Sequence, residues 1–180
     1  MNRVLLVLSL TGLLTACLDG GGGGGGSSDG GTDSPAPATG LAALEEAGEI
    51  PKLDRSTDLT GPDVDQDNIR DDIATYIDQH YTNEAQRNAA LQAARAMQQV
   101  FTVDLDDQVA VKEVNRQIAR ADHCIYLVFE EGNEVKPAAQ VSRELEAMAT
   151  NTKARLTRYL EFNKALDGSI WTTPRGNTCE

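Results

Sequence analysis

Three aspartates alternate along the stretch "DVDQDN", at Asp63, Asp65 and Asp67, immediately before a segment with helical periodicity. Carboxylates at every second position can converge on one cation if the backbone curls around it, and calcium takes six to eight oxygen ligands at about 2.3–2.6 Å. Asn68 follows where such a loop needs a sharp turn, and asparagine is one of the few residues that tolerate a left-handed backbone. The spacing therefore predicts a calcium loop.

The residues after the turn are expected to complete the ligand shell. Ile69 offers its backbone carbonyl while its side chain packs on the core, and Asp71 or Asp72 supplies a further carboxylate, with water. Two alternatives compete with a metal site: aspartates stabilise a helix N-terminus through its dipole, and an acidic loop can simply be solvated. Capping alone accounts for neither the alternation nor Asn68, so the metal interpretation is favoured.

Residues 63–72 resemble known calcium loops. They are similar to the D-x-D-x-D-G loops of EF-hands and, more closely, to the shorter D-x-D-x-D-G-[VI]-x-D-D loops of dockerin-like and thrombospondin type 3-like modules. Asn68 replaces the glycine, and Ala74 stands where an EF-hand has its bidentate glutamate. The resemblance covers this loop alone. These departures should weaken calcium binding to about 10⁻⁴–10⁻³ M, the range of extracellular modules, and a single loop without a partner loop favours a structural ion over a calcium sensor.

The N-terminus has the pattern of a bacterial lipoprotein signal. Arg3 precedes an apolar run, residues 4–14, which is shorter than the roughly 20 residues of a membrane span. Leu14-Thr15-Ala16-Cys17 then resembles a lipobox. The resemblance implies that residues 1–16 are removed as a signal peptide and that Cys17 carries the lipid. The alternative is an ordinary secretory signal that happens to end in cysteine.

The residues after this cysteine favour the outer membrane and predict a flexible tether. Leu18 occupies the position at which this class carries an aspartate as an inner-membrane retention signal, and Asp19 comes one place later. Residues 17–40 are mostly glycine, serine, aspartate, proline and alanine, so they bury too little apolar surface to offset the entropy of ordering. We therefore expect a lipid-anchored linker followed by one domain, residues 41–180, which carries the acidic loop 63–72.

Cysteine count and charge constrain the compartment and the partners. With Cys17 assigned to lipid, Cys124 and Cys179 form an even pair in an oxidising compartment, which predicts a disulfide. The alternative is a reactive thiol at Cys124 beside His123, but adjacent helical residues point about 100° apart, so this histidine is poorly placed to activate it. The net charge of −12 argues against nucleic acid as a partner, and contact with the membrane is expected through the lipid alone.

Hydrophobic periodicity predicts an all-α domain of about five helices. Apolar residues recur at intervals of three and four, and alternating Val/Ile/Thr-rich runs are scarce. The expected segments are 69–80, 83–101, 107–132, 137–150 and one that contains Leu156 and stops at Gly168, with a short additional helix in "LAALEEAG". Asp106 or Asp107 is expected to cap the third and central helix. The last helix is expected to face the core through Leu156, Tyr159, Leu160 and Leu166.

The sequence contains no recognisable catalytic motif. Its two histidines, His80 and His123, lie in neither an HExxH nor a GxSxG setting. Glu130, Glu131 and the run 104–107 could supply the paired carboxylates of a glycosidase, but charged helix ends are far commoner. We therefore expect a non-enzymatic binding or structural protein of the cell envelope, acting with an unknown envelope protein. The alternatives are an envelope hydrolase and an inhibitor or accessory subunit of an envelope complex.

Overall fold

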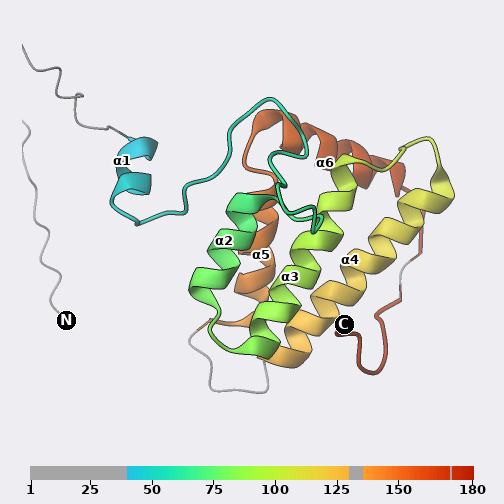
Figure 1. Cartoon of the computed structure of the whole chain (residues 1–180). Helices are drawn as coiled ribbons and strands as arrows, with labels where there is room; N and C mark the ends of the chain where they lie inside the picture. Colours follow the sequence, from blue (N-terminus) through green and yellow to red (C-terminus); the bar gives the residue numbers. More distant parts are fainter. Residues whose placement is uncertain (1–39, 130–135, 171) are drawn as a thin grey trace, which may run out of the picture. The chain divides into compact units, whose positions relative to one another are not determined.

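A computed structural model describes residues 40–129, 136–170 and 172–180 of the chain. Within these residues it contains six α-helices, one 3₁₀ turn and no strand, which confirms the all-α prediction (Figure 1). The predicted signal peptide, Cys17, almost all of the linker and the expected helix end at Gly132 lie outside the described residues. The elements are α1 (Leu41–Glu46), α2 (Asp71–His80), α3 (Glu84–Gln98), η1 (Gln99–Phe101), α4 (Gln108–Phe129), α5 (Ala138–Ala149) and α6 (Lys153–Ala165).

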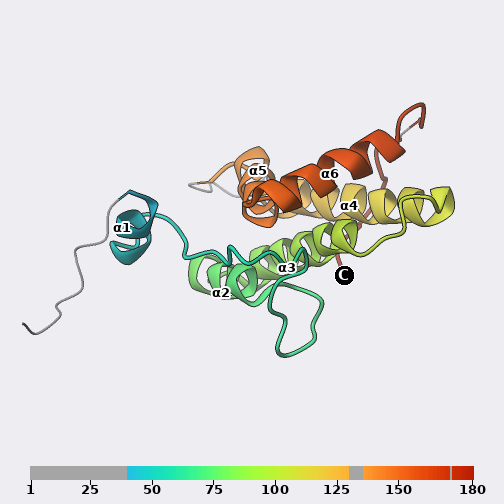
Figure 2. The same ribbon diagram turned by 90° about the horizontal axis from the view of Figure 1, so that it is seen from above.

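Helices α3 and α4 form the centre of the domain. α3 packs against α2, α4 and α5, and α4 packs against α5 and α6. Figure 1 shows α3 and α4 running side by side, and in Figure 2 α5 and α6 lie on the same side of α3. The core consists of the apolar stripes that the periodicity predicted for α2 to α5, because each of these helices must bury one face. Its buried members include Ile73, Ile77, Val111, Val114, Ile125, Val141, Leu145 and Met148.

Side-chain caps fix where the two central helices begin. Asn83 accepts a hydrogen bond at 3.2 Å from the backbone N–H three residues later, at the start of α3. Asp107 Oδ1 accepts from the N–H groups of Val109 and Ala110 at 2.9 and 3.0 Å, which confirms the predicted cap of α4. Both caps supply acceptors to N–H groups that have no partner within the helix.

The start of α2 differs from the prediction by two residues. The helix begins at Asp71, although its apolar periodicity extends back to Ile69. The N–H of Ile69 donates to Asp67 Oδ1 at 2.8 Å, so the acidic loop continues up to this point. The side chain of Ile69 is nevertheless only 1% exposed, as expected for a core residue.

The predicted apolar face of α6 is only half right: Leu166 is buried in the core and Tyr159 packs against the core, but the other two predicted residues do neither. Leu156 and Leu160 are 46% and 58% exposed, whereas Arg155 and Phe162 are buried on the opposite side of the helix. Arg155 is 0% exposed because its guanidinium is bound by backbone carbonyls of the loop before α2. Hydrogen bonding of one arginine therefore sets the rotation of α6, and two leucines remain in solvent as a consequence.

Candidate metal site and the contacts that hold it

The acidic loop closes on itself through aspartate side chains. Asp63 Oδ1 accepts from the Asp67 N–H at 3.1 Å, and its Oδ2 accepts from the Asn68 N–H at 3.1 Å. Asp71 Oδ1 accepts from the Val64 N–H at 3.0 Å, so the first residue of α2 holds the beginning of the loop. The backbone thus wraps around the carboxylates of Asp63 and Asp71, as a cation-binding loop requires.

Two residues of this loop have a left-handed backbone. Asn68 has φ of 66°, which confirms the sharp turn predicted there. Gln66 has φ of 60°, which the sequence did not predict because glutamine has no special tolerance for this region. The two turns, spaced two residues apart, curl the backbone tightly enough to bring carboxylates from both ends together.

Three of the predicted ligands form one group. Each of Asp63, Asp65 and Asp71 places one carboxylate oxygen within 4.8 Å of the other two. Asp65 is exposed, and the other two are partly buried. Like charges at this separation disfavour one another, so a bound cation would relieve a repulsion that is present in the folded chain. The three carboxylates could therefore hold a metal ion.

Two other predicted ligands, the carboxylates of Asp67 and Asp72, lie outside this group, and the carbonyl of Ile69 stays a predicted ligand. Asp67 Oδ1 accepts from the Ile69 N–H at 2.8 Å, and the Asp67 carbonyl accepts from Arg95 Nε at 3.0 Å, which fastens the loop to α3. Ile69 contributes its side chain to the core. Asp72 is turned to Arg70, whose Nε and Nη2 donate to its two oxygens at 2.6 and 3.0 Å. Asp72 therefore stands in an ion pair, and Asp71 is the carboxylate that joins Asp63 and Asp65.

Sequence reasoning missed a buried arginine that organises the neighbouring loop. Arg155 makes five hydrogen bonds: to the carbonyls of Asp54, Asp58 and Leu59 at 2.8, 2.8 and 3.0 Å, to Asn151 Oδ1 at 2.9 Å, and to Asp54 Oδ2 at 2.5 Å. A guanidinium has five N–H donors, so this one is fully paired. No pattern in the sequence marks the residue, because arginines on amphipathic helices are usually exposed.

A second buried arginine joins the same cluster. Arg70, 1% exposed, donates to the Met148 carbonyl at 3.0 Å and to Asn151 Oδ1 at 3.3 Å, besides its pair with Asp72. The hydrogen bond from Arg155 lowers the pKa of Asp54 to about 2, which keeps this carboxylate charged. We call Asp54, Arg70, Asp72, Asn151 and Arg155 the arginine cluster.

The arginine cluster holds both ends of the acidic loop. Arg70 lies at the C-terminal end of the loop, immediately before α2. Gly61, with φ of 68°, lies just before the N-terminal end of the loop. A Cβ atom at Gly61 would lie 2.4 Å from Arg70 Cδ and 2.9 Å from Arg155 Nη2. Only glycine fits here, because the backbone is left-handed and it runs directly against the two guanidinium side chains.

Both histidines contact neighbouring groups of the fold in the described part of the chain. His80 is exposed; its ring stacks on Tyr76 at 4.0 Å, and its Nδ1 lies 2.8 Å from the carbonyl of Tyr76. It borders an open groove of about 790 Å³ between α2, α5 and the residues after α1. The groove is also lined by Glu144, whose carboxylate pairs with Lys136 at 2.5 Å. Of the carboxylates that could serve a glycosidase, Asp107 caps α4, and Glu130 and Glu131 lie outside the described residues.

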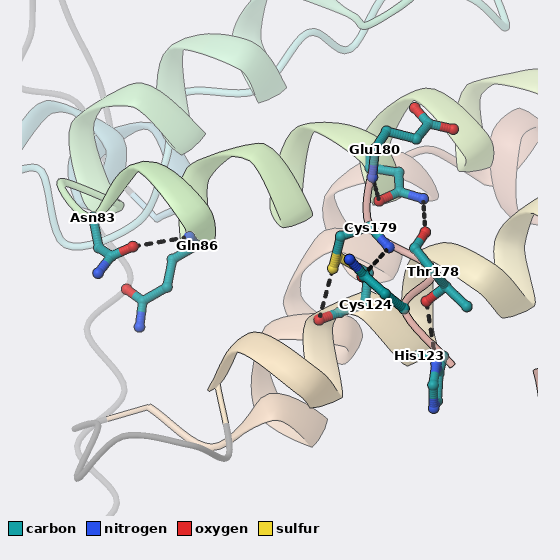
Figure 3. Close-up of a disulfide and its surroundings, with 9 residues drawn as sticks. Asn83, Gln86, His123, Cys124, Thr178, Cys179 and Glu180 are labelled. Carbon is teal, nitrogen blue, oxygen red and sulfur yellow. Dashed lines mark hydrogen bonds between the residues drawn. A yellow bond between two sulfur atoms is a disulfide. The ribbon is translucent and has the colours of Figure 1, made fainter. Parts of the chain in front are cut away.

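The predicted disulfide is present. Cys124 on α4 is bonded to Cys179, with 5.0 Å between the Cα atoms (Figure 3). His123 points to the other side of the C-terminal segment, where its Nδ1 lies 3.1 Å from Thr178 Oγ1. Cys124 is therefore half of a cross-link, and the alternative of a histidine-activated thiol does not describe this arrangement.

Comparisons with known proteins add no relative: no family model, curated protein or solved structure matches the chain. Among the residues that the structure describes, none of the helices combines the length and the apolar character needed to cross a membrane.

Proposed function

We propose that this chain is a lipid-anchored protein of the cell envelope with a non-enzymatic binding or structural role, and that its helical domain carries one structural calcium ion. The observation that carries the calcium assignment is the convergence of Asp63, Asp65 and Asp71 within 4.8 Å. Three carboxylates at one point are unfavourable without a cation, and the loop around them has the turns that such a site needs.

Calcium is favoured over magnesium by the make-up of the loop. Magnesium demands near-ideal octahedral geometry and gives up its water reluctantly, whereas calcium accepts irregular shells of protein oxygens and water. With Asp72 engaged by Arg70, the ligands proposed are Asp63, Asp65 and Asp71, completed by water and by oxygens of residues 67–69. Because the loop leads directly into α2, the ion would act as a clip at the entrance to the helical core.

The envelope location is supported by two independent features. The lipobox-like Leu14-Thr15-Ala16-Cys17 supplies an anchor site, with the outer membrane favoured over the inner by Leu18. The disulfide is typical of oxidising compartments outside the cytoplasm. A lipid anchor, an acidic domain and a cross-linked helical core suit a protein that binds an envelope partner at the membrane surface.

Calcium should raise the melting temperature of the wild-type domain, whereas Asp65→Asn/Asp71→Asn should lose this response. At about ten times the Kd, binding stabilises the folded state by roughly 1.4 kcal/mol, or on the order of 5 °C for a domain of this size. Asparagine keeps an acceptor oxygen for the hydrogen bonds from Val64 and Asp67 and removes only charge. Thermal unfolding in EDTA, millimolar calcium and millimolar magnesium measures the effect.

Asp106→Asn is the matched control for this experiment, since it removes one exposed carboxylate from a different loop. It should respond to calcium as the wild type does. If wild type shows no rise with calcium, or if the double variant shows the same rise, the aspartates serve only as helix caps and the calcium assignment fails.

Cys17→Ser should abolish incorporation of labelled fatty acid and release the protein from membranes. More than one acyl chain is needed for stable anchoring, and each buried methylene contributes about 0.8 kcal/mol. The measurement is metabolic labelling followed by membrane fractionation. Cys124→Ser/Cys179→Ser, which removes the other two cysteines, should keep both label and membrane association. Undiminished labelling of Cys17→Ser would contradict the proposed anchor.

A further inference from the structure

The side-chain amide of Gln92 holds the backbone of the C-terminal segment Thr178–Glu180, with hydrogen bonds like those between two β-strands. Gln92, on α3 and only 6% exposed, donates from Nε2 to the Thr178 carbonyl at 3.0 Å and accepts at Oε1 from the Glu180 N–H at 3.3 Å. One buried side chain thus pairs with a C=O and an N–H two residues apart. These contacts hold the backbone and do not depend on the side chains of the segment.

Helix α4 recognises the side chains of the same segment. Thr178 is 0% exposed, with its hydroxyl 3.1 Å from His123 Nδ1, and Cys179 is bonded to Cys124 (Figure 3). The face formed by Gln92, His123 and Cys124 therefore holds this segment through its backbone and through the side chains of Thr178 and Cys179. We call it the α3–α4 face.

The residues that connect this segment to α6 are weakly held. Between 167 and 177 no described residue is buried, and most are exposed. Gly168 and Gly176 have φ of 75° and 76°, and a Cβ atom at either would meet nothing within 4 Å. Eleven residues can span up to about 36–40 Å when extended, so the connection can reach beyond its own domain.

We propose that the α3–α4 face binds this segment from a second copy of the chain once the disulfide is opened, giving a dimer in which Cys124 of one copy is bonded to Cys179 of the other. The occupant follows from the structure, because the segment that fits the face is the one seen in it. Exchange keeps every contact that the segment makes with the α3–α4 face. Only the path of the residues that connect the segment to α6 changes, which is the condition for domain swapping.

The chemistry of exchange needs a small-molecule thiol and no net oxidant. The thiolate attacks the sulfur of the partly exposed Cys179, the S–S bond breaks, and Cys124 leaves as a thiolate from its buried position. The small molecule is then held on Cys179 as a mixed disulfide. The Cys124 thiolate of the second copy attacks Cys179, forms the new S–S bond and releases the small thiolate unchanged, so electrons and atoms balance.

Isotope mixing tests the proposal on the wild-type chain. Unlabelled and ¹⁵N-labelled proteins are mixed, incubated with reduced and oxidised glutathione, acid-quenched and digested without reduction. Mass spectrometry should find Cys124–Cys179 peptides with one light and one heavy half, and size-exclusion chromatography should find a dimer. Without glutathione, mixed peptides should be absent. If alkylation shows that both cysteines opened while every linked peptide stays all-light or all-heavy, exchange does not occur.

Substitution of Gln92 separates specific docking from random cross-linking. Because Gln92 makes the same contact in the closed chain and in the swapped dimer, its loss weakens both forms relative to the undocked chain. Gln92→Ala and the isosteric Gln92→Glu, which lacks the donor for the Thr178 carbonyl, should each lower about tenfold the ratio of mixed light–heavy peptides to protein that carries glutathione on Cys179. Gln140→Ala, at an exposed glutamine of α5, should leave this ratio unchanged. Circular dichroism confirms that each variant is folded. An equal ratio in wild type and a folded Gln92 variant would show that the α3–α4 face does not direct the exchange.

Discussion

Replacing Arg155 with methionine is expected to lower the free energy of unfolding by about 3–5 kcal/mol, the usual cost of leaving a buried ionic group without its partner. Methionine keeps much of the buried aliphatic volume but donates no hydrogen bond. The Asp54 carboxylate, 20% exposed, would lose its partner, and the carbonyls of Asp58 and Leu59 would lose their donors. Urea denaturation followed by circular dichroism measures the difference.

Lys153→Met is the matched control, because Lys153 is an exposed cation on the same helix. Surface substitutions of this kind usually change stability by less than about 0.5 kcal/mol. Asp54→Asn offers a milder probe of the same contact if Arg155→Met does not fold, and it should also be destabilised. Equal stabilities for the Arg155 and Lys153 variants would show that the five hydrogen bonds have no net effect on folding.

Gly61→Ala should destabilise the domain by roughly 2–4 kcal/mol, from two causes that add. An alanine with a left-handed backbone costs about 1 kcal/mol or more, and forcing an extra carbon into a packed site typically costs about 1–3 kcal/mol. The new Cβ atom would lie 2.4 Å from Arg70 Cδ, so one of the two guanidinium groups must leave its hydrogen bonds. The free energy of unfolding from urea denaturation gives the magnitude.

Gly168→Ala measures the part of the loss in free energy of unfolding that comes from the left-handed backbone alone. Its φ of 75° is close to the 68° of Gly61, but a Cβ atom there meets nothing within 4 Å. It should therefore lose only about 1–2 kcal/mol from backbone strain. Losses of the same size at the two glycines would mean that the arginine side chains move aside without cost, and that the close approach at Gly61 does not stabilise the fold.

Periodicity was sufficient to predict most of the helical core. The stripes of α2 to α5 follow from intervals of three and four, since each of these helices contacts its neighbours mainly through apolar side chains. α6 departs from this rule because polar contacts determine which face is buried. Arg155 replaces an apolar residue at the centre of its buried face, and a pattern of hydrophobic residues cannot reveal a charged residue in that position.

The acidic loop was predictable in its residue types and its turn but not in its pairing. Alternating aspartates followed by Asn68 predicted a curled backbone, and φ of 66° at Asn68 confirms the turn. The choice between Asp71 and Asp72 depended on Arg70, which binds Asp72 because Arg70 itself is buried against the carbonyl of Met148. That contact joins residues 78 positions apart, and no local pattern contains such information.

The position of the arginine cluster along the chain has a mechanical consequence for a membrane-tethered protein. Tension from the proposed anchor enters the domain from its N-terminal side and reaches residues 54–59 before α2. Arg155 fastens these residues to α6, and Asn151, between α5 and α6, adds a second attachment through the Asp54 carbonyl at 2.8 Å. A force applied at the proposed anchor would therefore pass to the last helices of the bundle in parallel through several hydrogen bonds, and the acidic loop, which follows in the chain, would carry little of the load.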